Sequence, residues 1–139
     1  MKIQLKESQV LNLVVKECFD EAGNSMEIEM SCLPNRNNDT EFSIIFSLEI
    51  VMPQQFYLDI TFKANFTTQI GDSLEEPLPL EENFQNHPFI NVNAPAIAYP
   101  FLRTTVATIL LNCGYNPIML PAVNFQAKYN EQKSSNLDK

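Results

Sequence analysis

Two runs in which apolar residues alternate with mostly polar ones constrain the fold of this chain more than any other feature. Their apolar positions are Phe42, Ile44, Phe46, Leu48, Ile50 and Met52, followed by Phe56, Leu58, Ile60, Phe62, Ala64 and Phe66. Between them lie polar residues such as Ser43, Glu49 and Lys63. A period of two places one face of a strand in a core and the other in water. Because residues 53–55 form a short connection, we predict an antiparallel hairpin.

Two less regular segments precede the hairpin and complete the predicted sheet. Residues 26–32 alternate in the same way and are followed by a polar turn. In the first segment, Ile3 and Leu5 begin an alternation with apolar residues at odd positions, which Glu7 interrupts. A bulge, or an edge strand with a second partner, would explain the interruption. We therefore predict that region 1–70 forms four antiparallel strands.

Region 71–92 shows neither the two-residue period of a strand nor the 3.6-residue period of a helix, and it reads as an acidic, proline-containing loop. A solvated connection is the default interpretation, and a docking strip for a basic partner is the alternative. The whole chain has a net charge of −8, which argues against a nucleic-acid binder and against an anionic membrane surface. This charge suits a basic partner, or a protein that must stay soluble while it exposes apolar surface.

After the acidic loop the period changes, and we predict a main helix over 93–114. Asn93 can cap this helix and Pro95 fits its first turn, while Pro100 could instead mark a restart. Gly114 is expected to end it. The apolar stretch 94–113 is interrupted by Pro100 and Arg103, so it predicts a buried helix and not a membrane span.

The main helix is apolar around nearly its whole circumference. One side is expected to consist of Leu102, Val106, Ile109 and Cys113. A four-stranded sheet can cover only one side of such a helix, so a second copy of the chain is the economical cover for the other. We assign four of the remaining polar positions to the oligomer interface, namely Arg103, Thr104, Thr108 and Asn112.

Residues suited to catalysis or metal binding are sparse. His87 has no second histidine or nearby cysteine, and Cys18, Cys32 and Cys113 are too scattered for a disulfide framework. The chain has no nucleophile elbow, phosphate-binding loop or dinucleotide glycine pattern. We therefore predict no catalytic residues, no metal and no cofactor, with a small enzyme as the remaining alternative. The alternating start of the chain argues against a signal peptide, so we expect a cytoplasmic protein.

A set of spaced residues between 93 and 125 is more specific than any single motif. It consists of Ala94-Pro95, Tyr99-Pro100-Phe101, Arg103, Cys113-Gly114-Tyr115, Pro117 and Pro121-Ala122-Val123-Asn124-Phe125. The set covers about a quarter of the chain and resembles the SecB family of export chaperones. The resemblance implies an α+β fold, in which a four-stranded antiparallel sheet packs on a long C-terminal helix and a short second helix. It also implies a single domain, 1–139, with 115–139 as C-terminal segment and tail.

The resemblance further implies a function in protein transport. SecB-like proteins bind unfolded polypeptides or preproteins in apolar grooves, keep them competent for export and translocation without ATP, and deliver them to SecA. They assemble as homotetramers, each a dimer of dimers. The alternative is a SecB-like chaperone dedicated to one client, such as the antitoxin of a toxin–antitoxin system. Neither nucleic-acid binding nor membrane insertion is expected.

The resemblance also assigns roles to individual residues. The client-binding positions that it implies are Phe19, Met26, Leu120, Phe125 and Tyr129. Of these, Phe19 and Met26 flank a crossover that is shorter than in the family and lacks its tryptophan. The face expected to meet SecA holds Tyr57 and Asp59.

Overall fold

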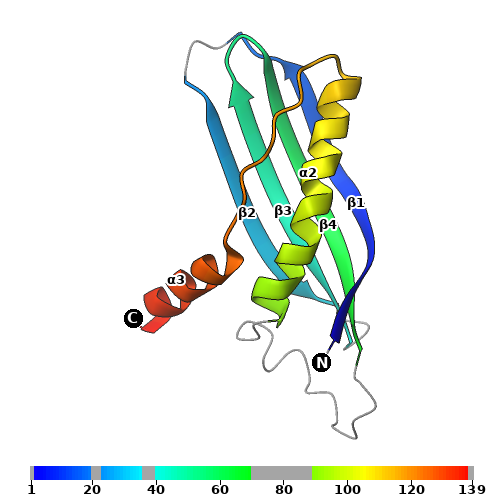
Figure 1. Cartoon of the computed structure of the whole chain (residues 1–139), viewed down its shortest axis with the longest axis vertical. Helices are drawn as coiled ribbons and strands as arrows, with labels where there is room; N and C mark the ends of the chain where they lie inside the picture. Colours follow the sequence, from blue (N-terminus) through cyan, green and yellow to red (C-terminus); the bar gives the residue numbers. More distant parts are fainter. Residues whose placement is uncertain (1, 20–22, 36–39, 70–88, 138–139) are drawn as a thin grey trace, which may run out of the picture.

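The computed structural model describes residues 2–19, 23–35, 40–69 and 89–137 (Figure 1). Its four strands form one antiparallel sheet in the order β1-β4-β3-β2. The strands are β1 (Lys2–Glu17), β2 (Ser25–Pro34), β3 (Glu41–Met52) and β4 (Phe56–Gln69). A long helix and a short second helix follow them, so the predicted α+β fold is confirmed. The predicted acidic loop lies for the most part outside the described residues.

The predicted hairpin of β3 and β4 is confirmed, and it forms the middle of the sheet. Its register runs from Glu41 opposite Thr67 to Met52 opposite Phe56, and Gln54 in the turn has a φ of 65°. All but one of the twelve alternating apolar residues are at most 2% exposed, and Met52 is half-buried. These side chains form the inner face of the sheet, which packs on the long helix.

The first strand contains two bulges, which explain its irregular sequence. The pairing of β1 with β4 skips one residue between Leu5 and Glu7 and another between Val10 and Asn12. Each bulge inserts one extra residue and lets the strand keep its apolar side chains on one face. Leu5, Val10 and Leu13 consequently lie opposite inner-face residues of β4. The bulge explanation is confirmed, and β1 is also an edge strand; a second partner for this edge stays a prediction.

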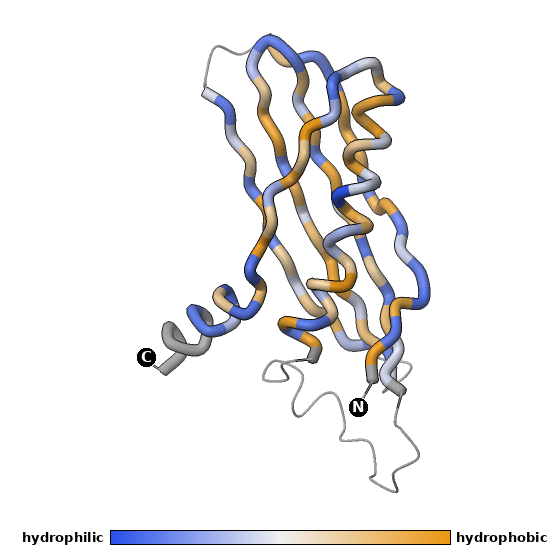
Figure 2. The backbone as a smooth tube through the Cα atoms, viewed as in Figure 1, coloured by the Kyte–Doolittle hydropathy of each residue, from blue (hydrophilic) through white to orange (hydrophobic). Residues whose placement is uncertain are grey.

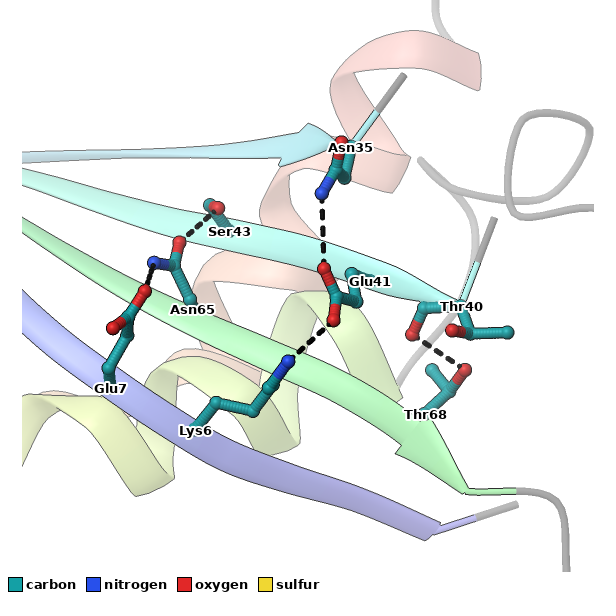
Figure 3. A network of polar contacts seen from close by, with 8 residues as sticks. All are labelled: Lys6, Glu7, Asn35, Thr40, Glu41, Ser43, Asn65 and Thr68. Atoms are coloured by element: carbon teal, nitrogen blue, oxygen red, sulfur yellow. Dashed lines mark hydrogen bonds and ion pairs between the residues drawn. The ribbon is translucent and has the colours of Figure 1, made fainter. Parts of the chain in front are cut away.

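A polar network fastens the strands together on the outer face near the first bulge (Figure 3). Lys6 donates to Glu41 at 2.7 Å, and Asn35 donates to the other oxygen of the same carboxylate at 3.1 Å. Beside this pair, Asn65 donates to Glu7 at 2.9 Å and accepts from Ser43. The extra residue at the bulge places Lys6 and Glu7 on the same face. One group thus connects β1 and β3 with Asn35, the residue after β2, and the other connects β1, β4 and β3.

The long helix, α2 (Ala94–Asn112), crosses the inner face of the sheet after a π-helical turn, η2 (Phe89–Asn93) (Figure 1). Helical structure thus begins within the region that we assigned to the acidic loop. Asn93 makes no side-chain cap bond, so the expected cap is wrong, because the preceding turn is already helical. Pro100 does not restart the helix but lies within it, whereas Pro95 occupies the first turn as predicted. Gly114 follows the helix end with a φ of +88°, which favours glycine.

Two of the four residues predicted for the buried side of α2 are buried, and the other two are not. Leu102 and Val106 are buried, but Leu110 continues this side, while Ile109 is half-buried and Cys113 is exposed. Ile109 and Leu110 lie three and four residues after Val106, so both are compatible with the helical period, and the way α2 lies against the sheet decides which of them is buried. The helical stretch Ile90–Asn112 is also long and apolar enough to meet the length and hydropathy criteria for a membrane span. Its buried residues pack on the sheet, as in a core helix.

The connection after α2 runs back along the sheet to the short helix α3 (Phe125–Leu137) (Figure 1). Tyr115 packs on Phe56 at the start of the connection, with ring centroids 5.4 Å apart. At its end, the Asn124 side chain accepts a hydrogen bond from the Ala127 amide at 2.9 Å and so caps α3. Most of α3 is hydrophilic (Figure 2), so few of its side chains can anchor it.

Candidate functional site

The inner face of the sheet is covered in its middle and half open along both edge strands. In β2, Met26 is 40% exposed, and Ile28, Met30 and Cys32 are half-buried. In β1, Val10 and Leu13 are exposed to a similar degree. The core therefore continues at each side into apolar surface that a partner could cover; we call this surface the apolar margin.

Phe19 lies at the end of the sheet and is 79% exposed. It lines a groove of about 390 Å³ between the end of β1, the β3–β4 turn and the start of the connection after α2. The lining residues are Glu17, Cys18, Phe19, Gln54, Gln55, Gly114, Tyr115 and Asn116. This groove therefore offers an exposed aromatic ring beside polar groups and exposed backbone.

A second, more apolar groove of about 450 Å³ lies between α2 and the connection. Its lining consists of Pro100, Arg103, Thr104, Ala107, Pro117, Ile118, Met119 and Leu120. It brings Leu120, predicted to bind clients, close to Arg103 and Thr104, predicted to bind another copy of the chain. The groove combines apolar surface with the guanidinium group of Arg103, and its lining contains no carboxylate, thiol or imidazole group for a metal ion.

An aromatic cluster holds the connection and α3 against the sheet. Tyr99 donates a hydrogen bond to the Pro121 carbonyl at 2.6 Å, and its ring meets that of Phe125 edge to face at 5.7 Å. Both rings also contact Phe46 in β3. Burial raises the pKa of Tyr99, so its hydroxyl stays protonated and remains a donor.

The structure separates the five predicted client-binding residues into two groups. Phe19 and Met26 are exposed, whereas Leu120, Phe125 and Tyr129 are 1%, 6% and 5% exposed. At these exposures the last three residues offer a client almost no surface, although Leu120 lies beside the second groove. In the described arrangement they anchor these segments.

The outer face of the sheet carries a row of carboxylates across three strands. Glu27 lies opposite Glu49, which lies opposite Asp59, and Glu29 lines the same shallow hollow of about 200 Å³. Tyr57 donates to Glu49 at 3.0 Å, and this bond raises the pKa of Tyr57. The predicted residues Tyr57 and Asp59 thus lie within a larger acidic surface. The sequence did contain the signal, since Glu27, Glu29 and Glu49 occupy outward positions of their strands.

The side of α2 that faces away from the sheet is a mixed apolar stripe. Its exposed residues, spaced three or four apart, are Ile97, Phe101, Thr104, Thr108 and Leu111. Of the residues assigned to the oligomer interface, Thr104, Thr108 and Asn112 are exposed, while Arg103 is half-buried beside the second groove. The sequence predicted that apolar residues surround this helix, but it did not identify Phe101 and Leu111 as the most exposed of them.

The described residues offer little for catalysis or metal binding. Among the described histidine, cysteine, aspartate and glutamate side chains, no group of three or more could hold a metal ion. The Cys32 thiol lies 3.7 Å from the Asn91 side-chain oxygen, and burial raises its pKa to about 11. This thiol is therefore protonated at neutral pH and is a poor nucleophile.

Comparison with known proteins gives consistent sequence matches. A family profile described as "SecB: Preprotein translocase subunit SecB" matches residues 16–136. The protein named "Protein-export protein SecB" from Methylibium petroleiphilum is 28% identical over 138 residues, which cover 91% of this chain and 81% of that protein. A protein of the same name from Paraburkholderia phymatum is 28% identical over 108 residues, covering 78% of this chain and 65% of that one.

Comparison of folds gives a similar result. A SecB-like chaperone of Mycobacterium tuberculosis, solved in complex with a ChAD peptide from the HigA1 antitoxin, superposes with a TM-score of 0.67. The superposition covers 87% of this chain and 89% of that one, at 16% sequence identity. At this identity, the similarity establishes a shared fold.

Proposed function

This chain belongs to the SecB family of protein-export chaperones, and on that premise we propose that it binds unfolded polypeptides or preproteins and keeps them competent for export. The observation that carries the proposal is the apolar margin on a chain with a net charge of −8. Burial of a client's apolar side chains on this surface favours binding. The net charge keeps a protein that exposes apolar surface soluble. Such holding needs no catalytic residue and no cofactor.

For the client site, we propose that the five predicted residues act in two stages. Phe19 and Met26 are accessible and would make the first contacts. Leu120, Phe125 and Tyr129 would join only when a client displaces the connection and α3. The support is that α3 is mostly polar and is anchored by buried side chains at Phe125 and Tyr129.

For assembly, we propose a homotetramer built as a dimer of dimers in the cytoplasm. The exposed stripe of α2, with Phe101 and Leu111, is apolar surface that the sheet of the same chain does not cover. Thr104, Thr108 and Asn112 on or beside this stripe, with Arg103, would line the contact between copies. Contact through α2 would bury the side of the helix that remains open in one chain.

For the export partner, we propose that the acidic outer face around Tyr57 and Asp59 contacts SecA. Glu27 and Glu49 extend this face beyond the two residues that the resemblance implies. Such a contact would be electrostatic and would weaken as salt is raised. The alternative is a chaperone dedicated to one client, such as an antitoxin. The fold shared with a chaperone solved with an antitoxin peptide favours that alternative, as does the short crossover.

The test is suppression of aggregation of a chemically denatured basic protein, followed by light scattering at 1:1 molar ratios and above. The wild-type chain should suppress aggregation, and the double variant Phe19→Ser with Met26→Ser should suppress it less. The lost binding is expected to be about 1–3 kcal/mol, while the melting temperature stays within a few degrees because both residues are exposed. Unchanged suppression by a folded double variant would remove both residues from the site. No suppression by the wild type would reject the function.

A further inference from the structure

Gln54 has a backbone conformation that its residue type disfavours. It is the third residue of the turn between β3 and β4, in which the Gln55 amide donates to the Met52 carbonyl at 3.0 Å. Its φ of 65° is the one positive φ of a non-glycine residue among the described residues. Proline at the second position and a positive φ at the third are the pattern of a type II turn, whose third position usually holds glycine. A glutamine at this position is strained, because its Cβ crowds the backbone.

The side chain of Gln54 does nothing within the described chain that would offset this strain. It is exposed, so it adds little to the core, and no described residue forms a hydrogen bond with its carboxamide. It lines the groove of about 390 Å³ beside Phe19. Strained residues in native proteins cluster at functional sites, where the side chain is needed for a ligand. The fold alone therefore does not explain a glutamine at this position.

The groove beside Phe19 is lined by carboxamides from two distant segments. Gln54 and Gln55 come from the turn between β3 and β4, and Asn116 comes from the connection after α2. All three side chains are exposed. Each carboxamide has one acceptor oxygen and two N–H donors, which complement the N–H and C=O groups of a peptide bond. Such a lining suits the main chain of a polypeptide, which offers these groups whatever its sequence.

We propose that Gln54 binds the main chain of a client in this groove, donating to a peptide carbonyl and accepting from a peptide N–H. The inference rests on the proposed function, because it assigns one residue to holding the client. Phe19 supplies the apolar contact, and Gln54 pairs the client's peptide groups that this contact removes from water. Glycine at position 54 would relieve the strain but remove the carboxamide. The proposal therefore accounts for glutamine where the turn favours glycine.

The variant Gln54→Gly separates the strain of this residue from its use in binding. The probe is a blocked, fluorescently labelled ten-residue peptide that alternates phenylalanine with serine and has no charge. Relief of the positive φ should raise the melting temperature of the full chain by about 1–3 °C. Loss of the carboxamide should raise the Kd for the peptide, measured by fluorescence anisotropy, about five- to tenfold. A lowered melting temperature would show that the side chain stabilises the fold, and would overturn the proposal.

The variant Gln54→Met removes the carboxamide but keeps the length of the side chain and the strain of the backbone. The Kd should again rise about five- to tenfold, because hydrogen bonds to the client are lost, while the melting temperature stays within about 1 °C. Gln9→Met is the matched control, since Gln9 in β1 is also exposed but does not line the groove. It should change the Kd less than about twofold. Binding by Gln54→Met as tight as by the wild type, or equal weakening by both variants, would overturn the proposal.

A second peptide tests whether the main chain is the group that Gln54 binds. Its central amides are replaced by esters, which have no N–H donor and a weaker carbonyl acceptor. Because the hydrogen bonds to the amides are already absent, Gln54→Met should weaken binding of the ester peptide by less than about twofold. A loss as large as with the amide peptide would assign Gln54 to a client side chain and overturn the main-chain contact.

The aggregation assay separates this inference from the proposed function. A wild-type chain that suppresses aggregation, but whose affinity for the amide peptide is unchanged by Gln54→Met, would retain its function and lose the Gln54 contact. A chain that neither suppresses aggregation nor binds the amide peptide would lose both.

Discussion

Phe46 in β3 and Met26 in β2 lie on the same face of one sheet, yet Phe46 is fully buried and Met26 is 40% exposed. The difference arises from their cover, because aromatic rings of α2 and α3 contact Phe46 while β2 forms an edge. The same contrast recurs on α2, where Leu102 is buried and its neighbour Phe101 is half exposed. Similar apolar residues thus serve folding in the centre and remain available to partners in the margin.

The sharpest test of this contrast is to truncate one residue of each kind. Phe46→Ala should lower the free energy of unfolding by about 3–5 kcal/mol, because it leaves a cavity against Tyr99 and Phe125. Met26→Ala should lower it by less than about 1 kcal/mol. Urea denaturation followed by circular dichroism, at one fixed protein concentration, measures both. A loss below about 1 kcal/mol for Phe46→Ala would contradict the assignment of the centre to folding.

A charge on the exposed stripe of α2 tests whether this stripe serves assembly. Phe101→Asp should weaken self-association by about 2 kcal/mol or more, because a buried aromatic contact between copies would be replaced by a carboxylate. Light scattering near micromolar concentration should then report the 15.9 kDa monomer, where the wild type gives a dimer or tetramer. Ala127→Asp places the same charge on the exposed side of α3 and should not change the assembly. A wild type that is itself monomeric would contradict the expected role of α2.

Tyr99 joins the buried centre of the sheet to the connection after α2. Tyr99→Phe should cost about 1–2 kcal/mol, since the Pro121 carbonyl loses its donor. Tyr115→Phe is the matched control and should cost less than about 0.5 kcal/mol, as its ring still packs on Phe56. Because burial raises the pKa of Tyr99, the contribution of this residue to the free energy of unfolding is complete below pH 10.0 and declines as pH rises above that value. Equal losses for the two variants would mean that the hydrogen bond does not fasten the connection.

The smallest effect is expected at the exposed pair of Lys6 and Glu41. Their hydrogen bond raises the pKa of Lys6 above 10.5 and lowers that of Glu41 below 4.5. The contribution of this pair to the free energy of unfolding is therefore present between pH 4.5 and pH 10.5. It is lost as pH falls through the lowered pKa of Glu41 or rises through the raised pKa of Lys6. Lys6→Gln should shift the melting temperature at pH 7 by no more than about 2 °C, since the pair is solvent-exposed. A larger shift would show that the network in Figure 3 is a structural clamp.

The sequence predicted those parts of the fold whose signals are local and periodic. Alternation placed β3 and β4 and identified their inward residues, and the glycine at 114 marked the end of α2. The buried position of Leu110 required the phase of the helix against the sheet, which the composition of the helix does not encode. Asn93 has the right chemistry for a cap, but the π-helical turn before it removes the free amides that a cap would bind.

The candidate site was less predictable because it depends on contacts between distant segments. The hydrogen bond from Tyr99 to Pro121 joins residues 22 apart, and no local pattern predicts it. The alternating pattern predicts that Glu27, Glu49 and Asp59 point outward, but their alignment in one row depends on the register of three strands. Likewise, burial of Phe125 and Tyr129 follows from how the connection returns across the sheet. Residue type alone does not distinguish a groove residue from an anchor.

The two bulges of β1 also determine where the chain can change length during evolution. Lys6 and Leu11 are the residues that the pairing with β4 skips, so deleting either one leaves the remaining side chains on their present faces. A deletion of Ile45 in β3, by contrast, would turn Phe42 and Ile44 toward water, because every side chain beyond the missing residue changes face. Natural insertions and deletions should therefore accumulate in the first strand and be nearly absent from the third.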